Sequence, residues 1–366
     1  MKVCVYAIAK NEEKFVDRWV DSMSEADEIY VLDTGSSDNT VKKLRARGVV
    51  VKKKKYDTFR FDVARNDSMK MLPKDADICV CTDLDEVFTP GWRNKLEKKW
   101  GKNTKQAKYR YVWNYNPDGS EGFVFMYEKV HARDGFCWTH PVHEVLKTDL
   151  KNYEVVTVDG ITLEHHADPT KSRGQYLRLL ELSVQEDPND DRNMHYLGRE
   201  YMFAGKWKEA IETLKKHLLL PSAKWRDERC ASMRFIGRYY ANLNMLQEAE
   251  FYFKLAICEC PNKREAYWEL AKFLYQKEKW QDCAVAIYSM ENIGTRDLSY
   301  ISDPECWSGV PYDMLSICNY YLSNKDEAIK YVKKAIDLSP DDSRLKENLK
   351  IFENMWFHFE NGLLFC

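Results

Sequence analysis

Two aspartates in the stretch ICVCTDLDEVF have the residue type and the spacing to bind a metal ion. Asp83 and Asp85 follow an apolar run that ends near Cys81, and a single residue separates them. Side chains two positions apart on an extended segment point the same way, and carboxylate oxygens are ligands that Mg²⁺ and Mn²⁺ prefer. A second pair with this spacing, Asp75 and Asp77, has no strand-like run immediately before it. The sequence therefore predicts a divalent-cation site at Asp83 and Asp85.

The same stretch also fits a different chemistry. An apolar strand followed by D-x-D-x-V begins haloacid-dehalogenase-like phosphatases, in which the first aspartate, here Asp83, is the nucleophile. That hypothesis requires a lysine and a pair of carboxylates later in the same α/β domain. The clearest Asp-Asp pairs, at 190–191 and 341–342, lie in a part of the chain with a helical pattern. A phosphatase is therefore the weaker alternative.

The pentapeptide D-T-G-S-S at residues 33–37 suggests a third chemistry, because pepsin-like aspartic proteases carry it around the active carboxylate. Such a protease needs two of these loops on all-β lobes. This chain has one, and it stands between a predicted strand and a predicted helix, so a protease is excluded. A carboxylate at the carboxyl end of a strand in an open α/β sheet faces the ligand crevice. Asp33 is therefore predicted to contact a nucleotide.

Strands and helices alternate from the start of the chain. Apolar runs at 2–9, 28–33 and 76–83 predict buried strands, and the segments between them have helical spacing. Further strand-like runs cover 107–115, 122–133 and 153–166. This alternation predicts an open, mostly parallel α/β sheet.

After Asp168 the pattern is helical to the end of the chain. Units resembling tetratricopeptide (TPR) repeats, which are about 34 residues long, have small residues where their two helices touch. They cover residues 196–214, 235–261, 324–340 and, more weakly, 266–288, with an insertion near 294–311. We expect an α/β domain at 1–170, a linking helix at 171–190 and an all-α, TPR-like solenoid at 191–366, closed by an amphipathic helix and an apolar end.

Composition sets limits on the function. The 366 residues exceed one ordinary domain, and a net charge of −2 gives no indication of bulk nucleic-acid binding. The 11 cysteines include no C-x-x-C pair that could build a zinc site. With no signal peptide or long apolar run in the sequence, we expect a cytoplasmic protein with reduced thiols and no transmembrane segment.

Six short motifs occur in an order that resembles a known family. Residues 1 to about 170 resemble a family 2 glycosyltransferase of the GT-A fold, a Rossmann-like domain that binds nucleotide sugars. The order is similar to that of bacterial lipopolysaccharide-core glucosyltransferases and of peptide glycosyltransferases that append TPR units, and the latter resemblance covers nearly the whole chain. The motifs are VYAIAKNEE, ADEIYVLDTGSSDNT, ARN, CTDLDE, HPVHEVL and ITLEHH.

The resemblance implies a role for each matching residue. Arg65 would pair with the diphosphate, and Thr34 stands where many relatives have a second aspartate that often reads uracil. We therefore favour a UDP-sugar without fixing the nucleotide. The nucleotide-sugar site implied in this way consists of Ile8, Lys10, Asp33, Thr34, Arg65, Asn66 and Asp83.

The resemblance also implies a metal site and a base. Asp83 and Asp85 would bind Mn²⁺ or Mg²⁺ together with a histidine from LEHH. Because adjacent strand residues alternate faces, only one of His165 and His166 can point at the metal, and the resemblance favours His165. Glu144 stands where inverting GT-A enzymes hold a carboxylate base, and His143 beside it would orient the acceptor.

These expectations combine into one function. The chain is predicted to be a metal-dependent inverting glycosyltransferase that moves a hexose from a nucleotide-diphosphate sugar to a peptide, protein or glycan acceptor. The TPR-like groove would receive the acceptor, and the C-terminal region could form a homodimer contact. The alternative from another class is a TPR interaction protein whose α/β half binds a nucleotide sugar without turnover.

Overall fold

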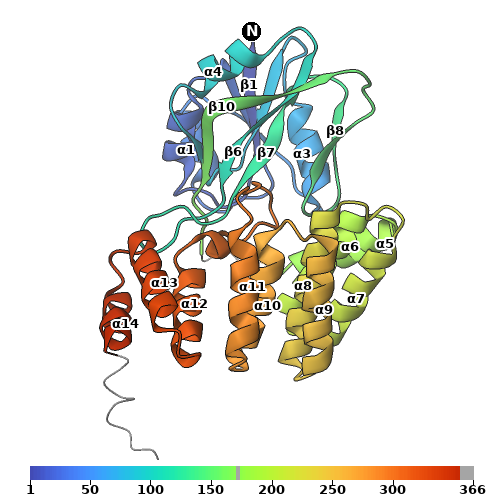
Figure 1. Cartoon of the computed structure of the whole chain (residues 1–366). Helices are drawn as coiled ribbons and strands as arrows, with labels where there is room; N and C mark the ends of the chain where they lie inside the picture. Colours follow the sequence, from blue (N-terminus) through green and yellow to red (C-terminus); the bar gives the residue numbers. More distant parts are fainter. Residues whose placement is uncertain (170–173, 355–366) are drawn as a thin grey trace, which may run out of the picture. The chain divides into compact units, whose positions relative to one another are not determined.

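The computed structural model describes residues 1–169 and 174–354. The chain divides into two compact units, Met1–Pro188 with Leu298–Tyr300, and Asn189–Asp297 with Ile301–Cys366. The first unit is a β-sheet covered by helices, and the second is built from helices. The predicted architecture, an α/β domain followed by a TPR-like helical region, is confirmed (Figure 1). In the described parts, no helix combines the length and the apolar character needed to cross a membrane.

The sheet of the first unit has eight strands in the order β3-β2-β1-β4-β7-β6-β10-β5. The four strands β1 to β4 run parallel to one another, whereas β7 is antiparallel to both β4 and β6, and β5 is antiparallel to β10. The sheet is therefore mixed, and the expectation of a mostly parallel sheet holds for its first half. Its strands are β1 Val3–Ala9, β2 Glu28–Asp33, β3 Val50–Lys53, β4 Ile78–Cys81, β5 Glu86–Phe88, β6 Thr104–Val112, β7 Val124–Ala132 and β10 Glu154–His165.

Strand β1 shows how the sheet is covered on both faces. Its residues Val3, Val5 and Ala7 belong to one buried apolar cluster, and Cys4 and Tyr6 belong to another. Because strand side chains alternate faces, a strand buried on both sides reads as a continuous apolar run. Helix α1 contributes to the first cluster, and the end of α3 contributes to the second. The helices of this unit are α1 Val16–Met23, α2 Thr40–Ala46, α3 Phe61–Met69, α4 Trp92–Lys99 and α5 Tyr176–Glu186.

A separate two-stranded hairpin carries the HPVHEVL motif. It consists of β8, Phe136–Thr139, and β9, Val145–Thr148, and the sequence pattern did not predict it. Asn66 of α3 fixes its position, because the side-chain amide donates to the carbonyl of Trp138 and accepts from its N–H, both at 2.8 Å. The hairpin loop, residues 140–144, is thereby held beside α3.

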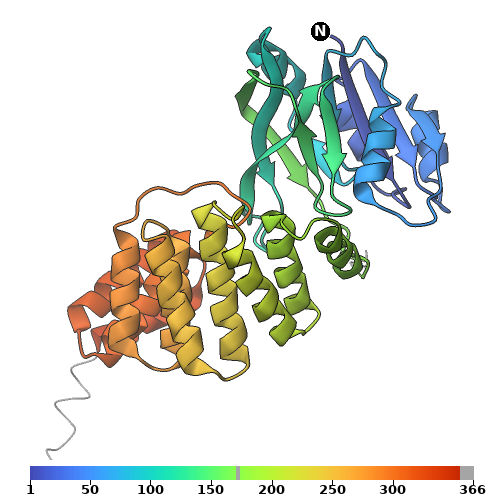
Figure 2. The ribbon, with the colours of Figure 1, turned by 90° about the vertical axis from the view of Figure 1, so that its right-hand side faces the viewer.

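In its described residues, the second unit stacks the helix pairs α6/α7, α8/α9, α10/α11 and α12/α13, which α14 follows (Figures 1 and 2). A Cβ atom on Gly237 would lie 2.6 Å from the ring of Phe253, and one on Gly198 would lie 2.5 Å from Leu214. The small residues predicted at the helix contacts are therefore required by packing. The helices are α6 Asp191–Phe203, α7 Trp207–Leu219, α8 Arg226–Asn242, α9 Leu246–Glu259, α10 Arg264–Gln276, α11 Trp280–Glu291, α12 Val310–Tyr321, α13 Lys325–Leu338 and α14 Ser343–Glu353.

Three sequence expectations concern the segments around this unit. The helix expected over 171–190 is observed as α5, which falls in the first compact unit, while residues 170–173 lie outside the described part. The insertion near 294–311 contains one short 3₁₀ helix, Pro304–Trp307. The apolar end expected after α14, and with it much of the suggested dimer contact, lies outside the described residues.

Candidate active site

The predicted site residues gather at the carboxyl edge of the parallel half of the sheet. Strand β1 lies between β2 and β4. The strands that follow β1 are added on one side as far as β3, and the chain then crosses to β4 on the other side of β1. In open α/β sheets, ligands bind at such a switch point. Asp33 is the last residue of β2, and Asp83 follows β4 by two positions. The topology therefore brings together two loops whose importance the sequence indicated.

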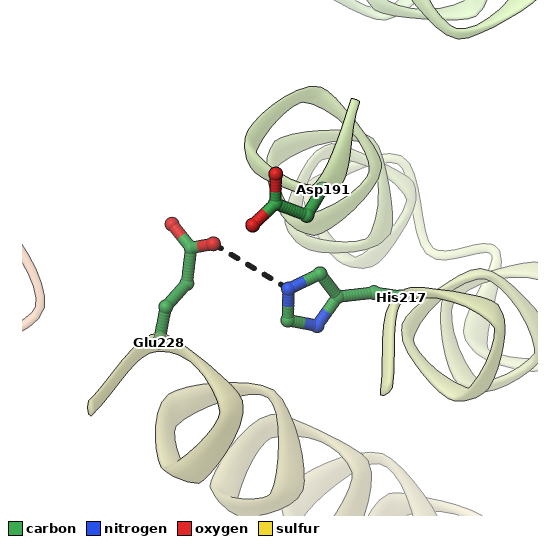
Figure 3. Close-up of side chains that lie close together, drawn as sticks. All are labelled: Asp191, His217 and Glu228. Atoms are coloured by element: carbon green, nitrogen blue, oxygen red, sulfur yellow. Dashed lines mark ion pairs between the residues drawn. The ribbon is translucent and has the colours of Figure 1, made fainter. Parts of the chain in front are cut away.

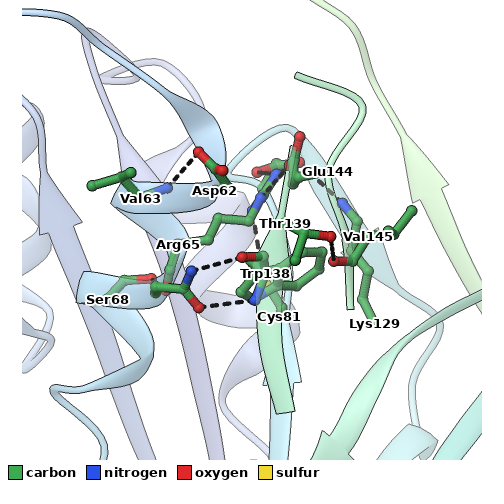
Figure 4. Close-up of polar contacts among 12 residues, drawn as sticks. Asp62, Val63, Arg65, Ser68, Cys81, Lys129, Trp138, Thr139, Glu144 and Val145 are labelled. Atoms are coloured by element: carbon green, nitrogen blue, oxygen red, sulfur yellow. Dashed lines mark hydrogen bonds and ion pairs between the residues drawn. The ribbon is translucent and has the colours of Figure 1, made fainter. Parts of the chain in front are cut away.

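Arg65 connects the D-x-D segment to the predicted base. Its guanidinium comes from α3, is 3% exposed, and donates to Asp83 at 2.9 Å. The same group donates through Nε to Oε1 of Glu144, which stands 79 positions later in the chain (Figure 4). Asp83 and Glu144 thus share one arginine, whereas the sequence predicted that Arg65 would pair with a diphosphate.

Lys129 and Glu86 also belong to this cluster, and sequence reasoning missed both. Lys129 lies on β7 with its Nζ 3.2 Å from Asp83 and 3.4 Å from Glu86. Glu86 is buried and accepts from the hydroxyl of Tyr111 at 2.8 Å. A lysine inside the apolar and aromatic run FVFMYEKVHA was the available signal, because a lysine on a central strand is buried only with a partner.

The two cations set the charge state of Asp83. Burial alone would raise the pKa of this carboxyl, but the positive charges of Arg65 and Lys129 hold it well below its usual range. Burial raises the pKa of Glu86 by more than the positive charge of Lys129 lowers it, and the negative charge of Asp83 raises it further. Asp83 is therefore an anion at neutral pH, locked between two buried cations.

Asp85 and His165 form a second pair in this region. Nε2 of His165 lies 3.6 Å from Oδ2 of Asp85, while Nδ1 is 2.9 Å from the carbonyl oxygen of Trp113. The carbonyl at Nδ1 requires the proton there, so Nε2 is the nitrogen directed at Asp85, as in metal-binding histidines. Burial alone would lower the pKa of His165, but the facing carboxylate of Asp85 raises it above its ordinary value. His166 instead lies 3.4 Å from Glu164. The structure thus separates the roles of the two adjacent histidines.

The carboxylate of Asp83 lies too far from this pair to complete a three-ligand metal site in the described residues. Within residues 1–169 and 174–354, no group of ligand atoms from Asp83, Asp85 and His165 lies within 4.8 Å of one another. The physical reason is that Arg65 and Lys129 hold the carboxylate of Asp83. A hard divalent ion often takes one or two protein carboxylates and completes its shell with substrate phosphates and water. Asp85 and His165 fit such an ion, and Asp83 would have to exchange its cationic partners to reach it.

Two residues predicted to contact the nucleotide are engaged within the protein. The carboxylate of Asp33 is buried and accepts from the N–H groups of Gly35, at 3.3 Å, and Ser36, at 3.2 Å, so it shapes the loop after β2. Thr34 is buried and donates to the carbonyl of Ala9 at 3.1 Å. In this conformation their polar atoms stabilise the loop after β2 and its contact with β1.

The remaining predicted residues are spread around the same edge. The side-chain amide of Asn66 is hydrogen-bonded to the backbone of β8. Ile8 is partly exposed near the end of β1, and Lys10 after it is exposed. His143 has a positive φ of 51° in the hairpin loop, and its ring lies edge-on to Tyr176 with the ring centres 5.8 Å apart. The structure therefore brings Arg65, Asp83 and Glu144 together but does not place Asn66 or Thr34 against the same group.

A cavity of about 570 Å³ adjoins the Asp85–His165 pair. Three aromatic residues line it, Phe15, Trp113 and Tyr115, and Trp113 stacks on His165 with the ring centres 4.5 Å apart. Lys14 and Arg18 supply positive charge to the same cavity, although Lys14 also forms an ion pair with Asp168 at 2.7 Å. This combination of ring faces and cations is suited to a polar ligand with a flat or puckered ring.

Two family models match parts of the chain. Residues 4–133 match the family described as Glycosyl transferase family 2, and residues 312–342 match a tetratricopeptide repeat. The match shows that the first unit contains a glycosyltransferase domain. More particularly, the chain carries a family 2 glycosyltransferase domain followed by a TPR region, as the sequence motifs predicted, and the phosphatase hypothesis is set aside.

Solved structures resemble the chain over about half its length. One is MamA, with 21% identity, coverage of 46% of this chain and 89% of that chain, and a TM-score of 0.37. Another is YrrB, described as a TPR protein with an unusual peptide-binding site, with 17% identity, coverage of 48% and 83%, and a TM-score of 0.36. MamA from Desulfovibrio magneticus RS-1 has 16% identity, coverage of 46% and 86%, and a TM-score of 0.37. Among curated proteins, none matches the chain.

Proposed function

We propose that this glycosyltransferase moves a hexose from a nucleotide-diphosphate sugar, with UDP favoured, to a peptide, protein or glycan acceptor, and that it inverts the anomeric centre. The main support is the shared arginine: Arg65 holds Asp83 of the D-x-D segment and Glu144 close to one another. Before a donor binds, a donor-side carboxylate and a candidate base are thus held beside one another. Such positioning is what a displacement at one carbon requires.

Glu144 is the base in this proposal. Its Oε1 accepts from Arg65, so Oε2 is the atom that would take the proton of the acceptor as the new bond forms. His143 precedes it at the same loop and would orient the acceptor. Arg65, held between two carboxylates, would shift toward the diphosphate when a donor enters, because its planar fork also matches phosphate oxygens.

Asp85 and His165, with Asp83 after it exchanges partners, would hold Mn²⁺ or Mg²⁺. Family 2 glycosyltransferases typically use a divalent metal, and such an ion neutralises charge on a departing diphosphate. The cavity beside His165 would receive a sugar, with Trp113 as its stacking surface. Acceptor binding by the TPR region is proposed from its repeat family, whose members present concave binding surfaces.

We also propose a cytoplasmic location. Every cysteine in the described part of the chain, ten in all, is a free thiol, which fits a reducing compartment. Cell fractionation with a tagged chain would test it, and recovery in an oxidising compartment would contradict it.

The test of the transferase proposal is turnover of a donor panel with Mn²⁺. Asp85→Asn keeps the size of the side chain but removes its charge, and we expect transfer and donor hydrolysis to fall at least about 10²-fold, as when one electrostatic stabiliser is removed. Asp75→Asn is the matched control, because Asp75 belongs to a D-x-D of the same spacing and is 73% exposed. Equal turnover of Asp85→Asn and wild type at limiting Mn²⁺ would contradict the assignment of Asp85 as a metal ligand.

A further inference from the structure

Three potential metal ligands converge in the helical unit, and none of them belongs to the proposed active site. Asp191 begins α6, His217 lies in the last turn of α7, and Glu228 lies in the first turn of α8. Figure 3 shows the three side chains pointing toward one another, and one ligand atom from each lies within 4.8 Å of the other two. His217 is fully buried, Glu228 is 3% exposed, and Asp191 is partly exposed.

The imidazole of His217 has one nitrogen without a hydrogen bond. Nε2 is buried and has no hydrogen-bond partner among the described residues. It points at Oε1 of Glu228, 3.4 Å away. A buried polar atom without a hydrogen bond costs free energy. This nitrogen therefore indicates a ligand, and that indication does not depend on the clustering of the three side chains.

A hydrogen-bonded chain on the other side of His217 provides a partner that can hold its proton on Nδ1. Nδ1 of His217 lies 2.9 Å from Oγ of Ser232, and the same Oγ lies 2.7 Å from Nδ1 of His195. When the hydroxyl of Ser232 donates to His195, it accepts from Nδ1–H of His217, and Nε2 of His217 is left with its lone pair.

The ligand atoms of Asp191, His217 and Glu228 lie close enough together to bind one cation. A proton on Nε2 would satisfy the contact with Glu228 alone, whereas a metal ion would satisfy His217, Glu228 and Asp191 together. The 3.4 Å separation of the first two ligand atoms also matches the edge of a tetrahedral zinc site, about 3.3 Å for bonds of about 2.0 Å. The imidazole ligand favours a transition metal over Mg²⁺ or Ca²⁺, which prefer oxygen ligands.

We propose that Asp191, His217 and Glu228 bind a divalent transition-metal ion, with Zn²⁺ the best match, which ties together the first three helices of the helical unit. The partly exposed Asp191 provides the access route, and water would occupy a fourth position. Ser232 and His195 act behind His217 by fixing its tautomer, as groups behind a metal-bound histidine commonly do. This site is independent of the proposed transferase chemistry.

The proposal is tested on the full chain after chelator treatment, incubation with ZnCl₂ and gel filtration. Bound zinc is measured by mass spectrometry, and the unfolding transition is followed with and without Zn²⁺. The variants are His217→Gln and Glu228→Gln. The matched control is Glu248→Gln, because Glu248 is exposed and holds the same third position in α9 that Glu228 holds in α8.

We expect wild type and Glu248→Gln to retain about one more zinc per chain than the other two variants, since they keep all three ligands. Any zinc bound at Asp85 and His165 cancels in this comparison. Zinc at about 100 times its Kd should raise the Tm of the helical unit by about 5–10 °C in wild type and Glu248→Gln only.

If wild type retains no more zinc than His217→Gln, the cluster is an imidazolium–carboxylate ion pair and the proposal is wrong. A zinc-induced rise in Tm that persists in Glu228→Gln would also overturn it. Should a buried variant fail to fold, Asp191→Asn changes the partly exposed ligand and gives the same comparison.

Discussion

Replacing Glu144 with glutamine separates the proposed base from a structural ion pair. Glutamine keeps the shape of the side chain and a carbonyl oxygen that can still accept from Nε of Arg65. It removes the negative charge and the ability to take a proton. Arg65 keeps its second counterion, Asp83, at 2.9 Å. The substitution therefore weakens the cluster without leaving the buried arginine unpaired.

The structural cost and the catalytic cost of Glu144→Gln differ in size. A hydrogen bond to a charged group contributes about 1.5–3 kcal/mol and a neutral one about 0.5–1.5 kcal/mol. Because the new amide still accepts from a charged arginine, we expect a loss of about 1–2 kcal/mol in the free energy of unfolding, which lowers the Tm of the first unit by about 2–8 °C. General-base help is typically about 10²- to 10⁴-fold in rate, or about 3–5 kcal/mol in the activation barrier. The predicted effect on kcat is thus larger than the effect on stability.

The assay measures kcat for one acceptor, donor affinity by calorimetry and the Tm of each variant. We expect kcat of Glu144→Gln to fall by about 10²- to 10⁴-fold, while the donor Kd changes little, because Glu144 is not proposed to touch the diphosphate. Glu121→Gln is the control, since Glu121 pairs with Arg110 at the surface of the same unit and should leave kcat unchanged.

Two results would refute this reasoning in different ways. Normal turnover in Glu144→Gln would place the base elsewhere. A large loss of donor affinity with a parallel loss of rate would show that Glu144 acts by holding Arg65 for the nucleotide, so that it is a positioning residue and not the base.

Two further predictions concern buried groups of the first unit. Lys129→Met should lower the free energy of unfolding by about 3–5 kcal/mol, because it leaves Glu86 and Asp83 without a shared cation. Adding Glu86→Gln to this variant should restore part of the loss. Strictly additive losses in denaturant titrations would contradict the ion-pair explanation. Burial lowers the pKa of His131 to about 4, so the unfolded chain binds its proton first as the pH falls. Stability should therefore be complete above about pH 6.5 and drop by up to about 3 kcal/mol toward about pH 4, and an unchanged pH slope in His131→Gln would rule this out.

Local signals in the sequence were sufficient to predict several elements. The apolar runs of β1, β2 and β4 predicted their strands because a strand buried on both faces must be apolar throughout. The small residues at Gly198 and Gly237 predicted the helix pairs because no larger side chain fits at those contacts. The position of Asp83 at the end of β4 followed from the same local pattern.

Other features depended on the folded chain because they join residues far apart in the sequence. Periodicity does not specify which charges meet, so nothing in the sequence showed that Arg65 would hold Asp83 and Glu144 together, or that Lys129 would be their neighbour. The β8–β9 hairpin that presents Glu144 is short and lacks a strong alternating pattern. These contacts were decided by the packing of separate elements.

The same distinction applies to the histidines. Alternation along β10 showed that only one of His165 and His166 could face the D-x-D segment, but the carbonyl of Trp113 decided the orientation of His165. His217 gave no sequence signal, because its partners Asp191 and Glu228 come from two other helices. A ligand set assembled from three helices exists only after they pack, since each helix alone contributes a single side chain.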